Sequence, residues 1–465
     1  MELTKRDRVH FIGVGGISMS GLAHALAVQG FCVSGCDRGD SERLAVLRQA
    51  GVEVSVGHDP AHIAGADVVI WTTAIREDNP ERKAALAAGC HLHHRSELLA
   101  WMLRGKRAIA VTGTHGKTTT TAMLGAVLVS AGLDPTVFVG GDVLAWRSNY
   151  RLGGGPYVVF EADESDKSFR EYNPCSQVIS CIEFDHGDQY GTLEAIEEHF
   201  GAFIAGADPN GFLVWGQDCQ RLQRLVPARA PGPTIGFGFH PEAEFRAVNL
   251  EYEGVRVRFG LLKAGKAAGT IDLQVPGQHN VLNALAALAA ADACGVPLDQ
   301  CRAALAGFTG TGRRFELLGK TDELAVYDDY AHHPTEVRAT LAAARQQGHK
   351  RVVAIFQPHL YSRTRDLMTD FATAFGDADV VVITGIYAAR EDPIPGVSAL
   401  ELARRVGEHE PGKPVYHAET KQEALERVQE LAQAGDLILS IGAGDVRQVG
   451  EALAQHLCKG RLSAP

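Results

Sequence analysis

Short apolar runs alternate with segments of helical period along nearly the whole chain. In the first hundred residues, apolar runs at 9–13, 31–36, 52–56 and 66–72 predict strands, and helices are expected to begin near residues 16, 41 and 80. Strands that are apolar throughout are typical of parallel sheets covered on both faces. Their alternation with helices therefore predicts βα repeats around a parallel sheet.

A second set of repeats is expected from about Lys106. A strand at 108–111 leads into a glycine-rich loop, and Gly132 closes the helix predicted at 117–131. Buried strands are predicted at 157–160 and 178–182. Residues 211–275 alternate apolar and polar side chains, which predicts a small, half-exposed antiparallel sheet before an alanine-rich helix at 280–294.

The alternation restarts near Leu324. Strands are predicted at 324–327, 351–356, 380–384 and 437–441, and helices near 334, 365, 398, 421 and 445. A chain of 465 residues is too long for one hydrophobic core, so several domains are expected. We predict an α/β protein with three domains at 1–104, 105–311 and 312–465, the outer two Rossmann-like and the central one of the P-loop ATPase type.

Composition narrows the class of protein. Hydrophobic residues make up 45% and charged residues 22% of the chain, as in a soluble globular protein, and no run of about 18 apolar residues is present. No apolar signal segment precedes the first strand, so we expect a cytoplasmic protein. A net charge of −11 argues against a nucleic-acid partner. The nine cysteines show neither a Cys-x-x-Cys pair nor zinc-like spacing, and we assign them no chemistry.

The strongest chemical signal is the loop Gly113-Thr114-His115-Gly116-Lys117-Thr118-Thr119 between a predicted strand and helix. Its glycines allow backbone N–H groups to approach phosphate oxygens, and the helix N-terminus favours negative charge. Lys117 would reach the β and γ phosphates of a nucleotide, and a hydroxyl would reach Mg²⁺. Val111 stands where the common form of this motif has glycine. The loop predicts an enzyme that uses ATP.

Acidic residues follow two of the predicted strands. Glu161 begins the run Glu-Ala-Asp-Glu-Ser-Asp after the strand at 157–160, and the run Glu-Phe-Asp-His ending at His186 follows the strand at 178–182. Parallel strands end at the same edge of a sheet, so both runs are expected to face the phosphate loop. They predict a site for Mg²⁺, with His186 a candidate ligand for a second metal.

A weaker signal follows the first strand. Gly13-Val14-Gly15-Gly16-Ile17-Ser18 with Asp37 after the second strand resembles a dinucleotide fingerprint, but Ser18 replaces its third glycine. Binding of another phosphate-bearing nucleotide is favoured over NAD(P), and a structural turn remains an alternative. Further cationic and imidazole groups occur in the third region, in runs containing Arg314, His333, and His359 to Arg365. They are candidates for neutralising phosphates across a cleft.

Together these motifs resemble the Mur ligase family over essentially the whole chain, and within it the ligases that act on UDP-N-acetylmuramate itself. The resemblance rests on the following segments: 13–16, 113–121, 161–169, 182–186, 277–284, 310–315 and 328–336. Ile17-Ser18 and Cys181 depart from residues frequent in relatives.

The resemblance implies roles for individual residues. Lys117 would bind the ATP phosphates, Thr118 and Glu161 one Mg²⁺, and His186 a second metal, with Mn²⁺ able to substitute. The remaining ATP contacts implied are Gly113, Thr114, His115, Gly116, Thr119, Asn280, Asn283, Arg314 and Asp329. The sugar-nucleotide contacts implied are Gly15, Gly16, Asp37, Thr73, Ala74, Arg95, His359, Arg363 and Arg365. The catalytic set implied is Lys117, Glu161, His186, Arg314 and His333.

The implied activity is ATP-dependent joining of L-alanine to the lactyl carboxylate of UDP-N-acetylmuramate in peptidoglycan synthesis, by a monomer or homodimer that binds neither nucleic acid nor membrane. Three alternatives stay open at this point. One is a recycling ligase that attaches a tripeptide to the same sugar nucleotide. The others are an NAD-dependent oxidoreductase, which needs the missing third glycine, and a non-catalytic nucleotide-binding protein.

Overall fold

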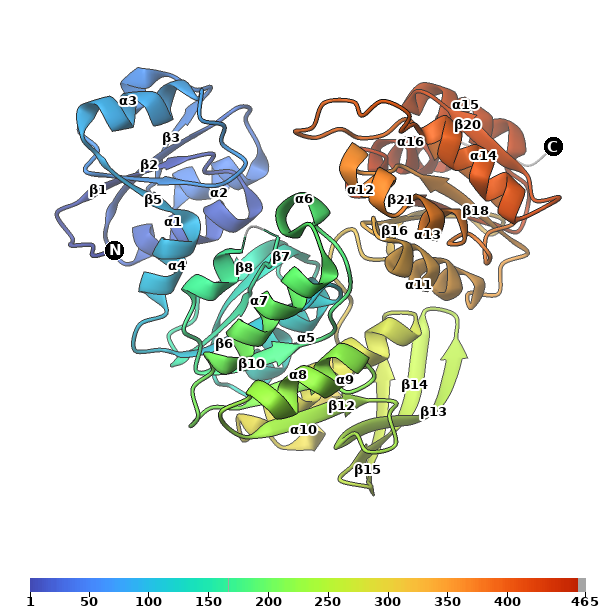
Figure 1. The fold of residues 1–465 in the computed structure, drawn as a ribbon, viewed down its shortest axis with the longest axis horizontal. Coiled ribbons are helices and arrows are strands. Elements are labelled where there is room, and N and C mark those ends of the chain that lie inside the picture. Colours follow the sequence, from blue (N-terminus) through green and yellow to red (C-terminus); the bar gives the residue numbers. More distant parts are fainter. Residues whose placement is uncertain (166, 459–465) are drawn as a thin grey trace.

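The computed structural model describes residues 1–165 and 167–458 and contains three sheets, each with its own helices. Figure 1 shows the N-terminal part (blue) and the C-terminal part (orange to red) on either side of a central part (green to yellow). The predicted α/β fold with three sheet units is confirmed. No helix in the described ranges is both long and apolar enough to span a bilayer.

The N-terminal sheet has five parallel strands in the order β3-β2-β1-β4-β5. Its elements are β1 (Arg8–Ile12), α1 (Ile17–Val28), β2 (Cys32–Asp37), α2 (Glu42–Gln49), β3 (Glu53–Val56), η1 (Pro60–Ile63), β4 (Val68–Trp71), α3 (Pro80–Ala88), β5 (His91–His94) and α4 (Arg95–Met102). The edge strand β5 was not predicted, because its sequence His-Leu-His-His contains only one strongly apolar residue.

The central sheet has ten strands in the order β15-β14-β13-β12-β11-β10-β6-β9-β7-β8. Its strands are β6 (Arg107–Thr112), β7 (Thr136–Val143), β8 (Ser148–Arg151), β9 (Tyr157–Glu161), β10 (Ser176–Ile179), β11 (Leu213–Gly216), β12 (Thr234–Gly238), β13 (Phe245–Glu253), β14 (Arg256–Lys263) and β15 (Lys266–Leu273). Its helices are α5 (Lys117–Ser130), η2 (Ser168–Glu171), α6 (Gly187–Tyr190), α7 (Leu193–Ala205), α8 (Gln220–Arg229), α9 (Gln278–Ala293) and α10 (Leu298–Ala306).

The antiparallel section expected in this region is present but shorter than predicted. Strands β13, β14 and β15 pair antiparallel, whereas β11 and β12 within the predicted range pair parallel and continue the main sheet. β13 joins β12 directly, so the section extends the ten-stranded sheet instead of forming a separate one. Alternation was visible in β13 and β14 because one face of each is exposed.

The C-terminal sheet has six strands in the order β16-β17-β21-β18-β19-β20, parallel except for β16. Its strands are β16 (Glu316–Lys320), β17 (Ala325–Asp329), β18 (Arg351–Phe356), β19 (Val380–Thr384), β20 (Val415–Ala418) and β21 (Asp436–Ile441). Its helices are α11 (Pro334–Arg345), α12 (Tyr361–Asp366), α13 (Met368–Ala372), α14 (Ala399–His409), α15 (Lys421–Leu431) and α16 (Arg447–Cys458).

Helix starts follow local capping chemistry. Asn79 accepts hydrogen bonds from the first turn of α3. Pro80, the first residue of this helix, has no N–H group, so no backbone donor is left without a partner there. Ser398 and Thr420 cap α14 and α15 in the same way. These side chains satisfy backbone donors that would otherwise lack partners, which explains why helix starts near 80, 398 and 421 could be predicted.

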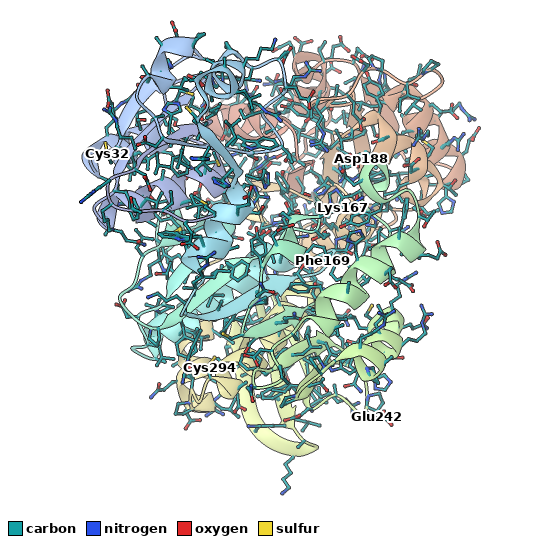
Figure 2. All side chains as sticks on the ribbon, turned by 60° about the vertical axis from the view of Figure 1, so that its left-hand side comes forward. Cys32, Lys167, Phe169, Asp188, Glu242 and Cys294 are labelled. Atoms are coloured by element: carbon teal, nitrogen blue, oxygen red, sulfur yellow. The ribbon has the colours of Figure 1, made fainter. Side chains whose placement is uncertain are left out.

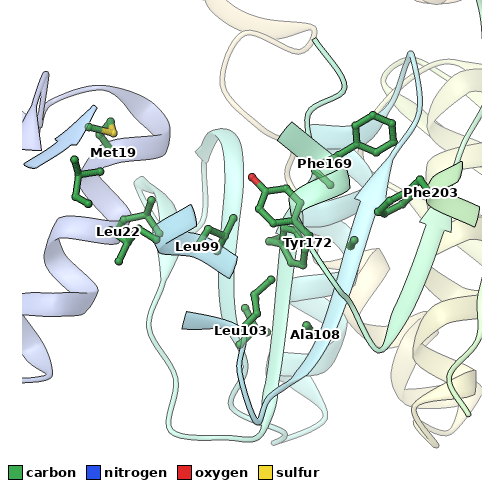
Figure 3. Close-up of a cluster of buried hydrophobic side chains, with 14 of the residues drawn as sticks. Met19, Leu22, Leu99, Leu103, Ala108, Phe169, Tyr172 and Phe203 are labelled. Atoms are coloured by element: carbon green, nitrogen blue, oxygen red, sulfur yellow. The ribbon is translucent and has the colours of Figure 1, made fainter. Parts of the chain in front are cut away.

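One hydrophobic core joins the N-terminal and central parts. Buried side chains run from α1 through α4 to the central sheet without interruption, and Figure 3 shows Leu22, Leu99, Tyr172 and Phe203 along this path. Burying a large apolar side chain contributes about 1.5 to 3 kcal/mol. The two parts are therefore held together by apolar packing. The C-terminal sheet has its own apolar layers on both faces.

Candidate active site

The phosphate loop lies between β6 and α5, as predicted. Gly113 and Gly116 adopt φ values of 123° and 81°, which side chains rarely tolerate. A Cβ atom on Gly113 would lie 2.2 Å from Oγ of Ser180, and one on Gly116 would lie 2.3 Å from Oδ1 of Asn283. The loop needs glycine at both positions, because a side chain at either one would collide with its neighbour.

Lys117 lies at the start of α5 with a side chain only 14% exposed, and it faces carboxylates. Its Nζ donates to Oε1 of Glu164 at 2.8 Å and to the carbonyl of Gly113 at 2.8 Å. Burial opposes the charged ammonium, but Glu164, Asp163 and Glu161 together raise the pKa of Lys117 above its usual value. Lys117 is therefore a fixed cation at the loop.

Glu161 ends β9 beside the phosphate loop and combines with Thr118. Thr118 Oγ1 donates to Oε1 of Glu161 at 3.1 Å, and the backbone N–H of Gly140 donates to Oε2 at 2.7 Å. Burial raises the pKa of the Glu161 and Glu164 carboxyls, and Oε2 of Glu164 has no hydrogen-bond partner among the described residues. Buried carboxylates beside a hydroxyl form an oxygen ligand set that suits Mg²⁺.

His186 lies between the two acidic runs. Its Nε2 is 3.6 Å from Oδ2 of Asp185 and 3.8 Å from Oε1 of Glu164. Its backbone adopts a left-handed φ of 53° at the start of α6. From the sequence, His186 is expected to bind a second metal. In the structure two carboxylates lie near its ring, and carboxylate and imidazole groups can bind the same metal ion.

A buried ion pair joins this region to the C-terminal part. Nε of Arg363 on α12 donates to Oδ1 of Asp185 at 2.8 Å, and both side chains are 6% exposed. Arg363 holds the pKa of Asp185 well below its usual range, against the effect of burial. His359 Nδ1 is 3.1 Å from Nη1 of Arg363. Arg365, on the same helix, instead pairs with Asp366 and is 54% exposed, so the structure does not bring it to this group.

Salt bridges also cross the same boundary nearby. Arg390 pairs with Asp188 of α6 at 3.2 Å, and Figure 2 shows Asp188 where the central ribbon meets the C-terminal one. One ion pair just before α6 and one within it thus hold this segment against the C-terminal part.

His115 of the phosphate loop is held between two carboxylates. Nδ1 is 3.2 Å from Oε1 of Glu336 on α11, and Nε2 is 3.1 Å from Oε2 of Glu183 after β10. Burial disfavours the imidazolium, but these carboxylates raise the pKa of His115 well above its usual value. Burial also opposes ionisation of Glu183, yet His115 lowers the pKa of that carboxyl to about 2. His115 is thus a cation that links the central and C-terminal parts.

His333, predicted as catalytic, lies in this same group. Its ring centre is 4.7 Å from that of His115, and its Nε2 is 3.1 Å from the carbonyl oxygen of Phe184. Its side chain also caps α11, where Glu336 three residues later completes a capping box. Burial lowers the pKa of His333, so it is neutral near pH 7.

A cavity of about 440 Å³ opens beside the phosphate loop. Volumes of this size are typical of small-molecule sites. The predicted nucleotide residues that line it are His115, Gly116, Thr118, Thr119, Asn280, Asn283, Arg314 and Asp329. The cavity therefore gathers residues from the phosphate loop, from α9 and from the C-terminal part.

The polar side chains of this cavity are held by hydrogen bonds. Asn283 Nδ2 donates to Oδ1 of Asn280 at 3.0 Å. Asp329 accepts from the backbone N–H groups of Phe315 and Ala331, both at 2.8 Å, while burial raises its pKa to about 6. Arg314 lies 4.0 Å from Glu336. These groups are fixed in position before any ligand binds.

The predicted sugar-nucleotide residues divide between two places. Gly15 N donates to Oδ2 of Asp37 at 2.9 Å, Gly16 begins α1, and Thr73 and Ala74 follow β4 at the same edge of the N-terminal sheet. Arg95 begins α4. Burial opposes ionisation of Asp163 in the central part, but Lys117 and, more weakly, Arg95 lower the pKa of that carboxyl. His359, Arg363 and Arg365 lie in the C-terminal part. Among the described residues, none from the N-terminal sheet lines the 440 Å³ cavity.

Two residues of the site were missed from sequence. Glu336 contacts His115, Arg314 and His332, yet it stood only at the end of a motif. Glu336 lies three residues after His333, which caps α11, and this capping-box spacing is the sequence signal that could have identified it. Glu164 was noticed only as part of an acidic run, and its contact with Lys117 needed the fold.

Comparison with known proteins agrees with this geometry. Residues 8–107 match the description "Mur ligase family, catalytic domain", residues 111–291 "Mur ligase middle domain" and residues 313–444 "Mur ligase, glutamate ligase domain". A protein of Symbiobacterium thermophilum named UDP-N-acetylmuramate–L-alanine ligase is 46% identical over 462 residues, covering 98% of this chain and 95% of its own. The chain belongs to the Mur ligase family.

Solved structures of Mur ligases share the fold. The UDP-N-acetylmuramate-alanine ligase MurC from Thermotoga maritima matches with a TM-score of 0.82 at 31% identity, over 97% of this chain and 99% of that one. A murein peptide ligase from Psychrobacter arcticus matches with a TM-score of 0.72 at 26% identity, over 99% and 100% of the two chains. This Mur ligase is therefore a ligase enzyme with the three-part family architecture.

Proposed function

We propose that this Mur ligase joins L-alanine to the lactyl carboxylate of UDP-N-acetylmuramate while ATP is converted to ADP and phosphate. The substrates are those in the printed name of the relative at 46% identity. The observation that carries the chemistry is that Lys117 faces Glu164 at 2.8 Å, while its neighbours Gly116 and Thr118 line the 440 Å³ cavity. A phosphate loop opposite oxygen ligands serves phosphoryl transfer from ATP.

The reaction proceeds in two balanced steps. An oxygen of the lactyl carboxylate attacks the γ-phosphorus, the bond to the bridging oxygen of ADP breaks, and an acyl phosphate forms. The amino nitrogen of L-alanine then attacks the carbonyl carbon, the bond to phosphate breaks, and the nitrogen loses a proton as the amide forms. The first step brings two anions together, so fixed cations must lie where charge accumulates.

This chain supplies such cations from two parts. Lys117 is the cation of the phosphate loop, and Arg314 lines the cavity beside that loop from the start of the C-terminal part. His115, held protonated by Glu183 and Glu336, fixes the distance between these parts. Asn280, Asn283 and Asp329 are assigned to the nucleotide, and His333 to the cleft near the acceptor. Partial burial of these groups strengthens each of these interactions.

Thr118 and Glu161 are the residues proposed to hold Mg²⁺, and His186 with its neighbouring carboxylates is proposed to hold a second ion. The oxygen set at Glu161 fits Mg²⁺, and the mixed set at His186 also fits Mn²⁺. A bound ion there would neutralise phosphate oxygens. The unpartnered Oε2 of Glu164 supports a cation in this region.

Replacing Glu161 with Gln is expected to raise the Mg²⁺ concentration needed for half-maximal activity by at least tenfold, because one charged oxygen ligand is lost. Activity is measured as phosphate release across a Mg²⁺ titration. Glu198→Gln on the exposed face of α7 is the control and should leave the titration unchanged. An identical Mg²⁺ curve for Glu161→Gln would remove that residue from the metal site.

The acceptor is tested by phosphate release with ATP, UDP-N-acetylmuramate and a panel of L-alanine, glycine, L-serine and an L-alanyl tripeptide. L-Alanine is expected to support the fastest release, and omission of any one substrate should abolish it. Faster turnover with the tripeptide would replace this proposal with the recycling activity. The comparison of L-alanine with the tripeptide is the most informative one, because a murein peptide ligase has a similar fold.

We further propose that the N-terminal part, residues 1–104, holds the UDP moiety through Gly15, Gly16, Asp37, Thr73, Ala74 and Arg95, that residues 105–311 hold ATP, and that residues 312–465 complete the ligase site. His359, Arg363 and Arg365 are assigned to the sugar nucleotide from that side. A cytoplasmic location and a monomeric or homodimeric state belong to the same proposal.

A further inference from the structure

A second cluster of reactive side chains lies within the N-terminal part, apart from the 440 Å³ cavity. His10 of β1, Cys36 of β2, Glu81 of α3, and His58 and His62 before and within η1 converge under the helix α3. No step of the ligase reaction uses them. His10, Cys36 and Glu81 are buried, with 1%, 0% and 0% exposure.

The contacts in this cluster centre on the Glu81 carboxylate. Cys36 Sγ donates to its Oε2 at 2.6 Å, and Nδ1 of His58 lies 2.9 Å from the same oxygen and 3.2 Å from Cys36 Sγ. These three atoms are thus mutual neighbours. His62 Nδ1 is 2.7 Å from the other oxygen, Oε1, so it orients the carboxylate from behind.

His10 closes the cluster from the sheet. One of its ring nitrogens lies with Cys36 Sγ and a Glu81 oxygen in a group of three atoms, all within 4.8 Å of one another. Its Nδ1 is 2.9 Å from Ser34 Oγ, whereas its Nε2 is buried and has no hydrogen-bond partner in the described part of the chain. A buried ring nitrogen without a partner is costly, and binding a ligand relieves that cost.

Burial and the contacts within the cluster set the protonation of these groups. Burial lowers the pKa of His10 to about 4, so its ring is neutral near pH 7. Burial opposes ionisation of Glu81, but hydrogen bonds from Cys36, His58 and His62 lower the pKa of that carboxyl. Burial and the neighbouring Glu81 raise the pKa of the Cys36 thiol.

We propose that His10, Cys36, His58 and Glu81 form a binding site for one divalent transition-metal ion, best matched by Zn²⁺. The donors are one sulfur, two imidazole nitrogens and one carboxylate oxygen, all of them ligand types that zinc binds in tetrahedral sites. Binding forms four metal–ligand bonds and releases the thiol proton of Cys36 to solvent. No change of oxidation state is involved.

The spacing of the ligand atoms is compatible with zinc. Metal–ligand bonds of about 2.0 to 2.3 Å in a tetrahedron place the ligand atoms roughly 3.3 to 3.6 Å apart. The three atoms from Cys36, His58 and Glu81 lie 2.6, 2.9 and 3.2 Å apart, so binding needs an expansion of less than about 1 Å. The His10 nitrogen lies within 4.8 Å of Cys36 Sγ and of a Glu81 oxygen, so it has to approach them by no more than about 1.5 Å to share the ion.

The site is joined to the glycine loop assigned to the sugar nucleotide. The carbonyl oxygen of Cys36 accepts from the N–H groups of Gly13 and Val14 at 2.9 and 2.8 Å, and the next residue, Asp37, accepts from Gly15. A metal bound to Cys36 would fix β1, β2 and α3 together directly below that loop. Its role is to hold the loop in shape, separate from the Mg²⁺ chemistry of the central part.

The first test measures metal content of the full-length enzyme. The protein is incubated with a small excess of Zn²⁺ in the presence of excess Mg²⁺, dialysed, and assayed by elemental analysis. One zinc per chain is expected, with a higher thermal midpoint than the metal-free protein. Retention of no zinc after dialysis would overturn the proposal and leave the cluster as a hydrogen-bond network only.

Replacement of Cys36 by Ser locates the ion. Serine can keep the hydrogen bond to Glu81 while removing the soft sulfur ligand, so the fold is preserved and zinc affinity should fall by more than tenfold. His62→Ala should weaken binding by roughly 10- to 100-fold, because it orients a ligand. Cys32→Ser, an exposed thiol on the same strand β2, is the matched control and should bind as wild type.

Cobalt substitution distinguishes this site from another histidine-rich group. His115, Glu183 and His333 also place three ligand atoms within 4.8 Å, with Cys181 near His115. Co²⁺ bound at the proposed site should show thiolate charge-transfer absorption that Cys36→Ser abolishes. The absorption should survive in Cys181→Ser. Loss of the band in Cys181→Ser, or its persistence in Cys36→Ser, would assign the ion elsewhere and refute the proposal.

Discussion

Replacing Lys117 with Ala is expected to lower the rate of phosphate release by roughly 10³-fold or more at saturating substrates. Lys117 is the cation of the phosphate loop, and three carboxylates hold it charged. Loss of one preorganised positive group opposite developing negative charge costs about 4 kcal/mol of transition-state stabilisation. That cost corresponds to a factor of several hundred to a thousand in rate.

The measurement compares turnover of Lys117→Ala with that of Lys266→Ala, which removes an exposed lysine at the start of β15. The control should turn over as wild type. Circular dichroism of both variants establishes that the fold is intact. Turnover of Lys117→Ala within a factor of ten of wild type would contradict the assignment of this loop to the γ-phosphate.

Replacing Arg363 with Met should destabilise the contact between the central and C-terminal parts by about 3 to 5 kcal/mol, because it leaves Asp185 buried without its partner. For a unit of 150 to 250 residues, 1 kcal/mol shifts the thermal midpoint by roughly 2 to 4 °C. The midpoint is therefore expected to fall by at least about 6 °C. Differential scanning calorimetry provides the measurement.

Arg365→Met, two positions along α12, is the matched control, because Arg365 is exposed and pairs only with a neighbouring carboxylate. Exposed pairs contribute about 0 to 1 kcal/mol, so its midpoint should be close to that of wild type. The double variant Arg363→Met with Asp185→Asn should recover part of the loss, since no unpaired charge remains. Equal midpoints for the two single arginine variants would show that the buried pair does not stabilise the contact.

Several features could be predicted from local sequence. The strand, loop and helix around Gly113 to Lys117 are encoded within about twenty residues, since glycine conformation and helix capping are local properties. Buried central strands such as β18 and β21 were found because they are apolar throughout. Edge strands β5 and β20 were missed because their short sequences are partly polar.

The edge at which acidic residues gather was also predictable. Glu161 and Glu183 each follow a strand of a parallel sheet, and parallel strands end at one edge. The pairing of β6 with both β9 and β10 places them on either side of the phosphate loop. What sequence could not specify was which carboxylate meets Lys117, because that choice depends on the path of the loop that contains Glu164.

By itself, the sequence of this Mur ligase determined the α/β class, the number of sheet units and the position of the phosphate loop, because these follow from hydrophobic period and local turn chemistry. Only the tertiary structure decided contacts between residues far apart in the chain. His115 meets Glu336 across 221 positions, and Asp185 meets Arg363 across 178. His10, Cys36 and Glu81 show no spacing that marks a site, yet parallel strand order and one covering helix bring them together. Such proximity is set by how sheets and helices pack, and packing depends on the whole chain at once.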